Sequence, residues 1–389
     1  MKRTHHIFLS VGFALTLFAG AILFWCLPDS DFSRTEKRGL QTLPRLDAES
    51  LLSGEFSSDV NDYFADQFPA RRFFVGVKGA CEIASGKGEN NGILLGANGQ
   101  LARRLFEIRR ADGSVCADMD HVDPSHVDAA ARGIARMLES AQVPACVLLP
   151  PRTLDVAADA FRYPNTTGEV LSVRLREGVN SASYLDLLPL YRTKYAQGEY
   201  VYYKTDHHWT ARGAYYAYAE ILRAYGMEEQ IIPQEAFEKR VITTDFYGTF
   251  WASGGMQFVP PDQMELWLLG NEDQFEMVAD GIRQESMYSM AHLETDPYAV
   301  LLDGTHDVVT LTRRDGAARP RLLILKDSFA NALAPFLVQH FDLILLNLSS
   351  VRQDFTNVTT LAREHEADAV LVVYTLGNVI GTDRMNRLQ

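Results

Sequence analysis

The hydrophobic pattern begins with one uncharged run near the N-terminus. Residues Ile7 to Leu27 carry no charge. A helix of that length, at about 1.5 Å per residue, crosses a bilayer core of about 30 Å. Lys2 and Arg3 precede the run, so the positive-inside rule keeps the N-terminus in the cytoplasm and sends the remainder outward. We therefore predict that residues 1–28 are a signal anchor of a single-pass plasma-membrane protein with an extracytoplasmic body.

Two other interpretations of this run stay open, a cleaved secretory signal and a lipoprotein signal that ends at Cys26. The apolar run exceeds the usual length of a signal sequence, and no small-x-small cleavage site follows it. Phe24 and Trp25 are bulky residues to precede a lipidated cysteine. All three interpretations leave the rest of the chain outside the cytoplasm.

The next segment, residues 29–100, has a polar part and a helical part. The composition is polar from Pro28 to about Leu46, which indicates a stalk. From Leu51 to Ala84 apolar residues recur near helical spacing, and Pro69 separates two short helices. A Gly-rich stretch ends in a predicted hairpin at Asn98-Gly99. We predict a stalk followed by an N-terminal helical arm.

Residues 101–389 alternate between short apolar runs and helical patterns. The predicted strands are 145–149, 200–203, 322–325, 343–348 and 370–374, and the predicted helices include one that Asp123-Pro124 opens, 211–225 and 329–340. Residues from about 230 to 319 lack helical rhythm and are predicted as a β-rich insertion. Buried strands separated by helices predict an α/β fold, a parallel sheet with helices on both faces and a ligand site at the carboxyl ends of the strands.

Composition narrows the classes of function. The formal net charge is −13 and no long basic run occurs, which excludes a generic nucleic-acid binder. The four cysteines contain no C-x-x-C pair, which argues against a zinc site and against a disulfide-dense scaffold. One bridge among Cys81, Cys116 and Cys146 stays open.

Two predicted strand ends carry reactive groups. In the segment Lys204 to Thr210, residues two apart point the same way, so Asp206 and His208 share a face while His207 points elsewhere. A carboxylate beside an imidazole suits a general base that deprotonates a hydroxyl. Ser328 follows a hydrophobic strand, and its own N–H lies at a helix start, ready to receive an oxyanion. These three side chains predict a Ser-His-Asp triad.

Other roles for the same residues stay open. Asp206 and Ser328 could each cap the helix that follows them. Asp206, His207 and His208 could hold a metal ion, but no further ligand motif such as H-E-x-x-H occurs, so we predict neither a metal nor a cofactor.

Five motifs in order resemble the bacterial DHHW family, which is named after Asp206-His207-His208-Trp209. The others are Phe64 to Pro69, Gly86 to Gly92, Phe246 to Thr249 and Leu325 to Phe329. The arrangement is similar to SGNH-hydrolase-like proteins that O-acetylate alginate and other exported bacterial polysaccharides. The resemblance implies an SGNH-like fold and assigns the triad to Asp206, His208 and Ser328. Ordinary SGNH enzymes have the serine block first, so the order here resembles the circularly permuted form.

The resemblance also implies further site residues. Asn378 resembles the amide of the Gly-x-Asn block, which would complete the oxyanion hole beside the Ser328 N–H; a simple turn at Gly377-Asn378 is the alternative. Lys326 stands where the SGNH serine block usually has Gly. Trp209 is predicted to bind substrate as a sugar-stacking platform, with core packing as the alternative, and Gly248 is predicted to offer its N–H to a ligand.

These observations predict a membrane-anchored serine acyl-ester hydrolase or O-acetyltransferase that acts on a bacterial cell-surface or exported polysaccharide. Its partners would be an acyl donor such as an acetyl ester, a glycan acceptor and an envelope export complex. The alternative is a non-catalytic glycan-binding or assembly protein of the cell envelope that uses the same fold.

Overall fold

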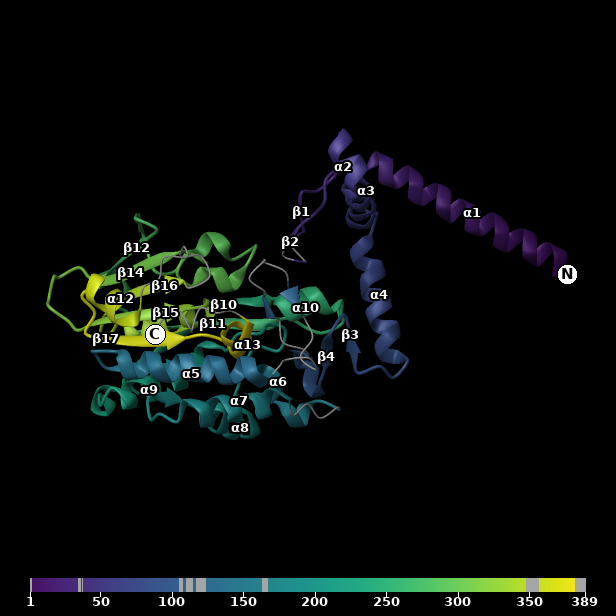
Figure 1. Ribbon diagram of the computed structural model, residues 1–389. Coiled ribbons are helices and arrows are strands. Elements are labelled where there is room, and N and C mark those ends of the chain that lie inside the picture. The colour runs from purple at the N-terminus through teal and green to yellow at the C-terminus, as the bar shows by residue number, and fades with distance from the viewer. Residues whose placement is uncertain are drawn as a thin grey trace. The chain divides into compact units, whose positions relative to one another are not determined.

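The computed structural model describes residues 2–33, 36, 38–104, 108–109, 115–116, 124–162, 167–347 and 357–381 (Figure 1). The chain divides into two compact units, Met1–Asn91 with Trp251–Phe258, and Gly92–Phe250 with Val259–Gln389. The second unit begins at Gly92, and the strand Ile93–Leu95 pairs there with Leu101–Arg103. There the N–H of Leu101 donates to the carbonyl oxygen of Lys204 at 2.8 Å.

The first unit contains the apolar helix and the helical arm. Helix α1 (Lys2–Cys26) is long and apolar enough over His6–Cys26 to cross a membrane, and none of that stretch is buried. The arm consists of α2 (Ala48–Ser53), α3 (Glu55–Asp66) and α4 (Arg71–Ala84), so the break predicted at Pro69 lies between two helices. The short strands β1 (Phe32–Ser33), β2 (Arg38–Gly39) and β3 (Glu89–Asn90) also belong to this unit.

The segment Trp251–Phe258 joins the first unit because it packs closely on α4. A Cβ atom built on Gly79 would lie 2.4 Å from the carbonyl oxygen of Gly255, so only glycine permits this approach. The side-chain amide of Asn90 donates to the carbonyl oxygen of Gly254 at 2.7 Å. The side of α4 that carries Gly79 is therefore in contact with this segment.

The second unit is built on an eight-stranded sheet with the order β13-β12-β14-β16-β15-β17-β8-β9. The strands are β8 (Ala145–Leu148), β9 (Tyr184–Leu185), β12 (Phe275–Ala279), β13 (Ile282–Gln284), β14 (Val308–Arg313), β15 (Arg321–Lys326), β16 (Asp342–Asn347) and β17 (Ala369–Val373). The strands from β16 to β9 are parallel, whereas β12, β13 and β14 are antiparallel. The predicted parallel sheet is confirmed, and strands of the predicted insertion extend it on one side.

Helices cover both faces of this sheet, as predicted. Along β15, Leu322 and Ile324 face one core with α9 (Ala211–Ala224), whereas Leu323 and Leu325 face the other. That second core contains side chains of α5 (Pro124–Ser140), α7 (Thr167–Val179) and α12 (Val358–Glu364). The apolar run of β15 is buried on both sides, which explains its uninterrupted hydrophobicity.

The remaining described elements of the chain are short or lie outside the large sheet. They are β4 (Ile93–Leu95), β5 (Leu101–Arg103), β6 (Ile108–Arg109), β7 (Val115–Cys116), β10 (Glu238–Phe246), β11 (Asp262–Leu268), α6 (Thr153–Val156), α8 (Leu188–Ala196), α10 (Thr249–Gly254), α11 (Ala334–Leu337) and α13 (Leu376–Gly381). Strands β10 and β11 pair with each other.

Two predicted elements differ from the structure. The predicted strand 200–203 makes only an isolated bridge between Tyr202 and Trp209, because its backbone pairs with the loop that follows it. The predicted helix 329–340 is a 3-10 turn over Ser328–Ala332 followed by α11. Cys26, Cys81 and Cys146 are free thiols, and the side chain of Cys116 lies outside the described residues.

Candidate active site

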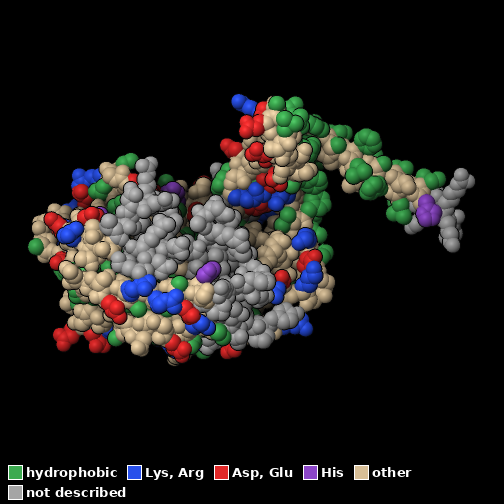
Figure 2. All heavy atoms as spheres, viewed as in Figure 1, with side chains coloured by type: hydrophobic (Ala, Val, Ile, Leu, Met, Phe, Trp, Pro, Cys, Tyr) green, Lys and Arg blue, Asp and Glu red, His purple; other side chains and the backbone are tan. Residues whose placement is uncertain are grey.

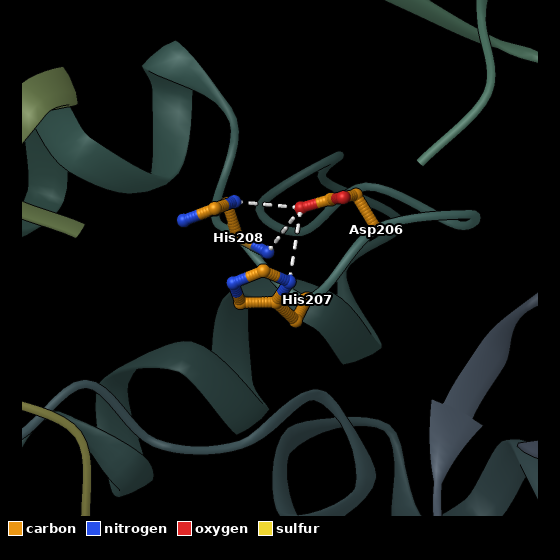
Figure 3. A group of neighbouring side chains, drawn as sticks. All are labelled: Asp206, His207 and His208. Atoms are coloured by element: carbon orange, nitrogen blue, oxygen red, sulfur yellow. Dashed lines mark hydrogen bonds and ion pairs between the residues drawn. The ribbon is translucent and has the colours of Figure 1, made fainter. Parts of the chain in front are cut away.

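The loop before α9 and the turn after β15 bring the three predicted triad residues together. The Nδ1 atom of His208 lies 2.7 Å from Oδ1 of Asp206, and its Nε2 atom lies 2.7 Å from Oγ of Ser328. Figure 3 shows Asp206 beside the two neighbouring histidines, with interactions to both. Asp206 and His208 are buried, so these contacts are shielded from bulk water.

The hydrogen bonds of Asp206 define the tautomer of His208. Oδ1 also accepts the backbone N–H of His208 at 3.0 Å, and Oδ2 accepts the N–H of Thr249 at 2.8 Å. An ionised carboxylate can only accept hydrogen bonds, so Nδ1 of His208 carries the proton that points to Asp206. Nε2 is then the acceptor that faces the Ser328 hydroxyl, as a general base requires.

The capping alternatives for Asp206 and Ser328 are not what the structure adopts. Thr210 is the N-cap of α9, where its hydroxyl accepts from the N–H of Gly213 at 3.2 Å. Asp327 is the N-cap of the turn after β15, and its carboxylate accepts from Phe329. Asp206 and Ser328 are therefore available for contact with His208.

A second buried carboxylate, Asp262 of β11, supports the loop from its other side. Its Oδ2 accepts the N–H of Thr205 at 2.7 Å, and its Oδ1 accepts the N–H of Lys204 at 2.9 Å. The hydroxyls of Thr205 and Tyr200 also donate to it. Burial raises the pKa of Asp262, and these hydrogen bonds oppose the shift. Sequence reasoning did not find Asp262, since a lone aspartate in a β-rich stretch carries no signal.

Gly248 packs against the same loop. Its N–H donates to the Thr205 hydroxyl at 3.0 Å, so the predicted role of offering this N–H to a ligand is wrong. A Cβ atom at position 248 would lie 2.3 Å from Cβ of Asp206. The structure therefore requires glycine here for a close approach to Asp206.

The Trp209 side chain is a core residue. It is fully buried, its ring lies edge-on to Phe329 with centroids 5.1 Å apart, and its Nε1–H donates to the Phe329 carbonyl oxygen at 3.1 Å. No ring face is open to a sugar, so the predicted stacking platform is wrong and the packing alternative holds. Trp209 instead fixes the residue that follows Ser328.

Asp327 connects the turn of Ser328 with the end of β17. Its carboxylate accepts from the N–H of Thr375 at 2.7 Å and from the side-chain amide of Asn378 at 3.1 Å. Burial raises the pKa of Asp327, and these donors oppose the shift. The contact places Asn378 at the same sheet edge as Ser328, as the motif order predicts. Its role as an oxyanion donor stays a prediction.

Lys326, the last residue of β15, is buried beneath the turn. Its Nζ donates to Oδ1 of Asn331 at 2.6 Å, and the amide of Asn331 donates to the Gly304 carbonyl oxygen at 3.0 Å. Burial lowers the pKa of Lys326 to about 8. This side chain supports the turn from inside.

Tyr298 is a site residue that sequence reasoning missed. Its ring stacks on the imidazole of His208, with centroids 3.7 Å apart, and its hydroxyl donates to the carbonyl oxygen of Ser328 at 3.1 Å. It lies in a 3-10 turn, Pro297–Val300, inside the predicted insertion. Nothing in the local sequence marks this tyrosine.

One group of described residues could supply ligands to a metal ion: Asp206, His207 and His208. Each offers one potential ligand atom, and these atoms lie within 4.8 Å of one another. His207 contacts the Thr249 hydroxyl through Nδ1 at 2.8 Å. Both ring nitrogens of His208 and both oxygens of Asp206 are engaged in hydrogen bonds. A metal ion would have to displace these contacts, so the geometry fits an acid–base triad better than a metal centre.

Comparison with known proteins finds solved structures with a similar fold. No curated protein matches the sequence. Bacillus cereus PatB1, solved with a sulfonyl adduct, aligns with a TM-score of 0.59 at 17% identity, over 76% of this chain and 97% of that chain.

The family resemblance is confirmed as well. Residues 187–346 match the family described as DHHW protein, and this range contains Asp206, His208 and Ser328. A DHHW family protein from Eubacterium siraeum aligns with a TM-score of 0.52 at 18% identity, over 75% of this chain and 95% of that chain.

Proposed function

We propose that this protein is a membrane-anchored, extracytoplasmic serine acyl-ester hydrolase or O-acetyltransferase that acts on a bacterial cell-surface polysaccharide. The observation that carries the proposal is the continuous chain Ser328 Oγ, His208 Nε2, His208 Nδ1 and Asp206 Oδ1, with 2.7 Å at each hydrogen bond. A hydroxyl, an imidazole and a buried carboxylate in this order form the arrangement of nucleophilic acyl transfer.

The chemistry proceeds in two steps. Oγ of Ser328 attacks the carbonyl carbon of an acyl ester while Nε2 of His208 takes the hydroxyl proton, and Asp206 stabilises the imidazolium. The tetrahedral intermediate collapses, and His208 returns the proton to the leaving alkoxide. In the second step His208 deprotonates water or a glycan hydroxyl, and the oxygen attacks the carbonyl carbon of the acyl-serine. The bond from that carbon to Oγ of Ser328 then breaks, and His208 returns the proton to Oγ.

The negative charge on the intermediate needs donors at the turn after β15. The N–H of Ser328 begins the 3-10 turn, where backbone N–H groups point outward. Asn378 supplies the second donor in this proposal. A primary amide carries two N–H donors, and the hydrogen bond to Asp327 orients the group.

The acetyl group and the glycan acceptor rest on the resemblance to proteins that O-acetylate exported polysaccharides. The extracytoplasmic location rests on α1, which is long and apolar enough to cross a membrane, and on the basic residues before it. An acyl donor and a polysaccharide partner outside the cytoplasm follow from these two supports.

The test is ester turnover by the full chain in detergent. We expect the parent to release acetate from p-nitrophenyl acetate and Ser328→Ala to fall to background, while Ser57→Ala, an exposed serine on α3, keeps full activity. A sulfonyl fluoride should label the parent at Ser328, located by peptide mass spectrometry. Acetyl transfer to a mannuronate oligosaccharide would separate the transferase from the hydrolase.

Two results would overturn the serine mechanism. A parent protein with neither turnover nor labelling at Ser328 would be a non-catalytic glycan-binding or assembly protein. Turnover that is lost with a chelator, retained in Ser328→Ala and restored by added zinc would identify metal-dependent hydrolysis at Asp206, His207 and His208.

A further inference from the structure

The helical arm exposes large apolar side chains that the proposed chemistry does not use. They lie on α3, on α4 and in the turn between these helices, and each is between 43% and 63% exposed: Phe64, Phe68, Phe73, Phe74 and Val77. We call this set the apolar arm face. Exposed apolar groups of this size mark an interaction surface. Figure 2 shows hydrophobic side chains on the surface of α1 and of the arm.

The apolar arm face lies on the side of α4 that is not packed within its own unit. Gly79 meets Gly255 on the packed side. At about 100° per residue, Val77 points about 160° away from Gly79. Helix α4 therefore has one face that packs against protein and an opposite face that is open and apolar.

The arm is fixed to the outer end of α1. The ring of Phe24 stacks on Phe64, with centroids 5.0 Å apart. Just after the helix, the backbone N–H of Ser30 donates to the side-chain oxygen of Gln67 at 3.0 Å, and the amide of Gln67 donates back to the Ser30 carbonyl oxygen at 2.8 Å. The end of α3 is thereby tied to the first residues that follow the apolar span.

We propose that the apolar arm face lies in the interfacial layer of the bilayer that α1 crosses, so that the chain contacts the outer leaflet through two elements. This inference rests on the signal anchor of the proposed function. The apolar surface of α1 continues into the arm through Phe24 and Phe64, and an aromatic-rich helix face is the kind of surface that settles between headgroups and acyl chains.

The acidic side chains of α3 agree with this orientation. Glu55, Asp59 and Asp62 project about 140° to 180° away from Phe64. They point away from lipid phosphates when Phe64 points toward the membrane. The acidic side chains of α3 therefore do not oppose the contact.

The test uses the full chain in phosphatidylcholine nanodiscs, with the native Cys81 as reporter. Cys81 is exposed on α4, about 40° around the helix from Val77. In a Cys26→Ser, Cys116→Ser background, Cys81 carries a polarity-sensitive fluorophore. The matched control replaces Cys81 with Ser and places the fluorophore on Asp62→Cys. Quenchers are a nitroxide at carbon 5 of the lipid chain and aqueous iodide.

We expect nitroxide lipid to quench the Cys81 fluorophore at least threefold more than the Asp62→Cys fluorophore, and iodide to show the reverse order. Phe73→Asn with Val77→Asn should abolish this difference, whereas Glu55→Gln with Asp59→Asn should preserve it. Equal quenching of both positions by iodide overturns the proposal. Protection of Cys81 from both quenchers also overturns it, because a protein surface then covers the face.

A separate experiment tests the membrane anchor: it measures whether the chain stays in the membrane fraction after alkaline extraction. A chain that is absent from this fraction refutes the anchor of the proposed function, and the contact of the arm with lipid falls with it. A chain that is present there but shows no preferential lipid quenching refutes only the contact of the arm.

Discussion

The ring of Tyr298 lies parallel to the imidazole of His208, at an interplanar angle of 11° and a centroid distance of 3.7 Å. The same tyrosine donates its hydroxyl to the carbonyl oxygen of Ser328. One buried side chain therefore contacts both the base and the nucleophile's backbone. Because proton transfer depends on sub-ångström placement of these groups, Tyr298 is a positioning residue of the proposed reaction.

Tyr298→Leu should lower kcat about 10- to 100-fold with little change in KM, since the stacked plane and the hydrogen bond are both lost. Tyr298→Phe should keep the stack and lose one hydrogen bond of about 1 kcal/mol, which corresponds to about fivefold in rate. The measurement is steady-state turnover of p-nitrophenyl acetate, with thermal melts of both variants. Equal losses in Phe and Leu variants would contradict the stacking role.

Asp206→Asn should lower kcat about 10⁴-fold while the fold is retained. The backbone N–H groups of His208 and Thr249 donate to Oδ1 and Oδ2, so the NH₂ of the new side chain opposes one of these donors in either orientation. An NH₂ at the Oδ1 position also faces Nδ1 of His208 and stabilises the tautomer with the proton on Nε2, which cannot accept the proton of Ser328. An NH₂ at the Oδ2 position leaves the N–H of Thr249 without an acceptor and displaces the loop that holds His208.

The control for this prediction is Asp186→Asn, which alters a surface aspartate paired with Arg176 and should leave kcat unchanged. Both variants are compared by turnover and by thermal melting. Activity within tenfold of the parent in Asp206→Asn would mean that Asp206 does not orient His208.

The core of the site could be predicted because its parts obey local rules. Asp206 and His208 are two residues apart in one loop, and Ser328 follows a strand that is buried on both faces, so the serine lies where a parallel sheet presents its carboxyl edge. The three side chains could be expected to meet without predicting the structure of the segment between His208 and Ser328.

The supporting residues could not be predicted because their contacts depend on the tertiary register of distant segments. Tyr298 reaches His208 across ninety positions of sequence, from a stretch without periodicity. Asp262 supports the loop by accepting the backbone N–H of Thr205, and a backbone donor is the same whatever side chain stands at that position. Trp209 has the same sequence context whether it is open to a sugar or buried, and only the position of Phe329 decides between them.

Gly248→Ala should destabilise the site loop and reduce turnover. The new methyl group would lie 2.3 Å from Cβ of Asp206, so the backbone of one segment must move, at a cost of about 1 to 3 kcal/mol. Because Asp206 lies at the contact, we expect kcat to fall more than the melting temperature alone explains. The control is Gly39→Ala, where the nearest atom to the new methyl group is 3.9 Å away. Full activity in Gly248→Ala would contradict this close approach.

Lys326→Met should make stability less dependent on pH between 8 and 10. Burial lowers the pKa of Lys326 from 10.5 to about 8. Below pH 8 the amine is charged in both the folded and the unfolded chain, so folding bears the full desolvation of the charge. Between pH 8 and 10.5 the folded chain has released a proton that the unfolded chain still binds, so the free energy of unfolding rises with pH, by about 3 kcal/mol over the whole window.

Methionine removes this titration and the hydrogen bond to Asn331 together. The free energy of unfolding of the variant should therefore match or exceed that of the parent at pH 7. Between pH 7 and pH 10 the free energy of unfolding of the parent should rise by about 2 kcal/mol or more relative to that of the variant. Denaturant unfolding at both pH values measures the difference, with Lys239→Met, an exposed lysine on β10, as the control. A parent–variant difference that stays constant from pH 7 to 10 would show that Lys326 keeps an ordinary pKa, and the turn of Ser328 would then rest on a charged amine.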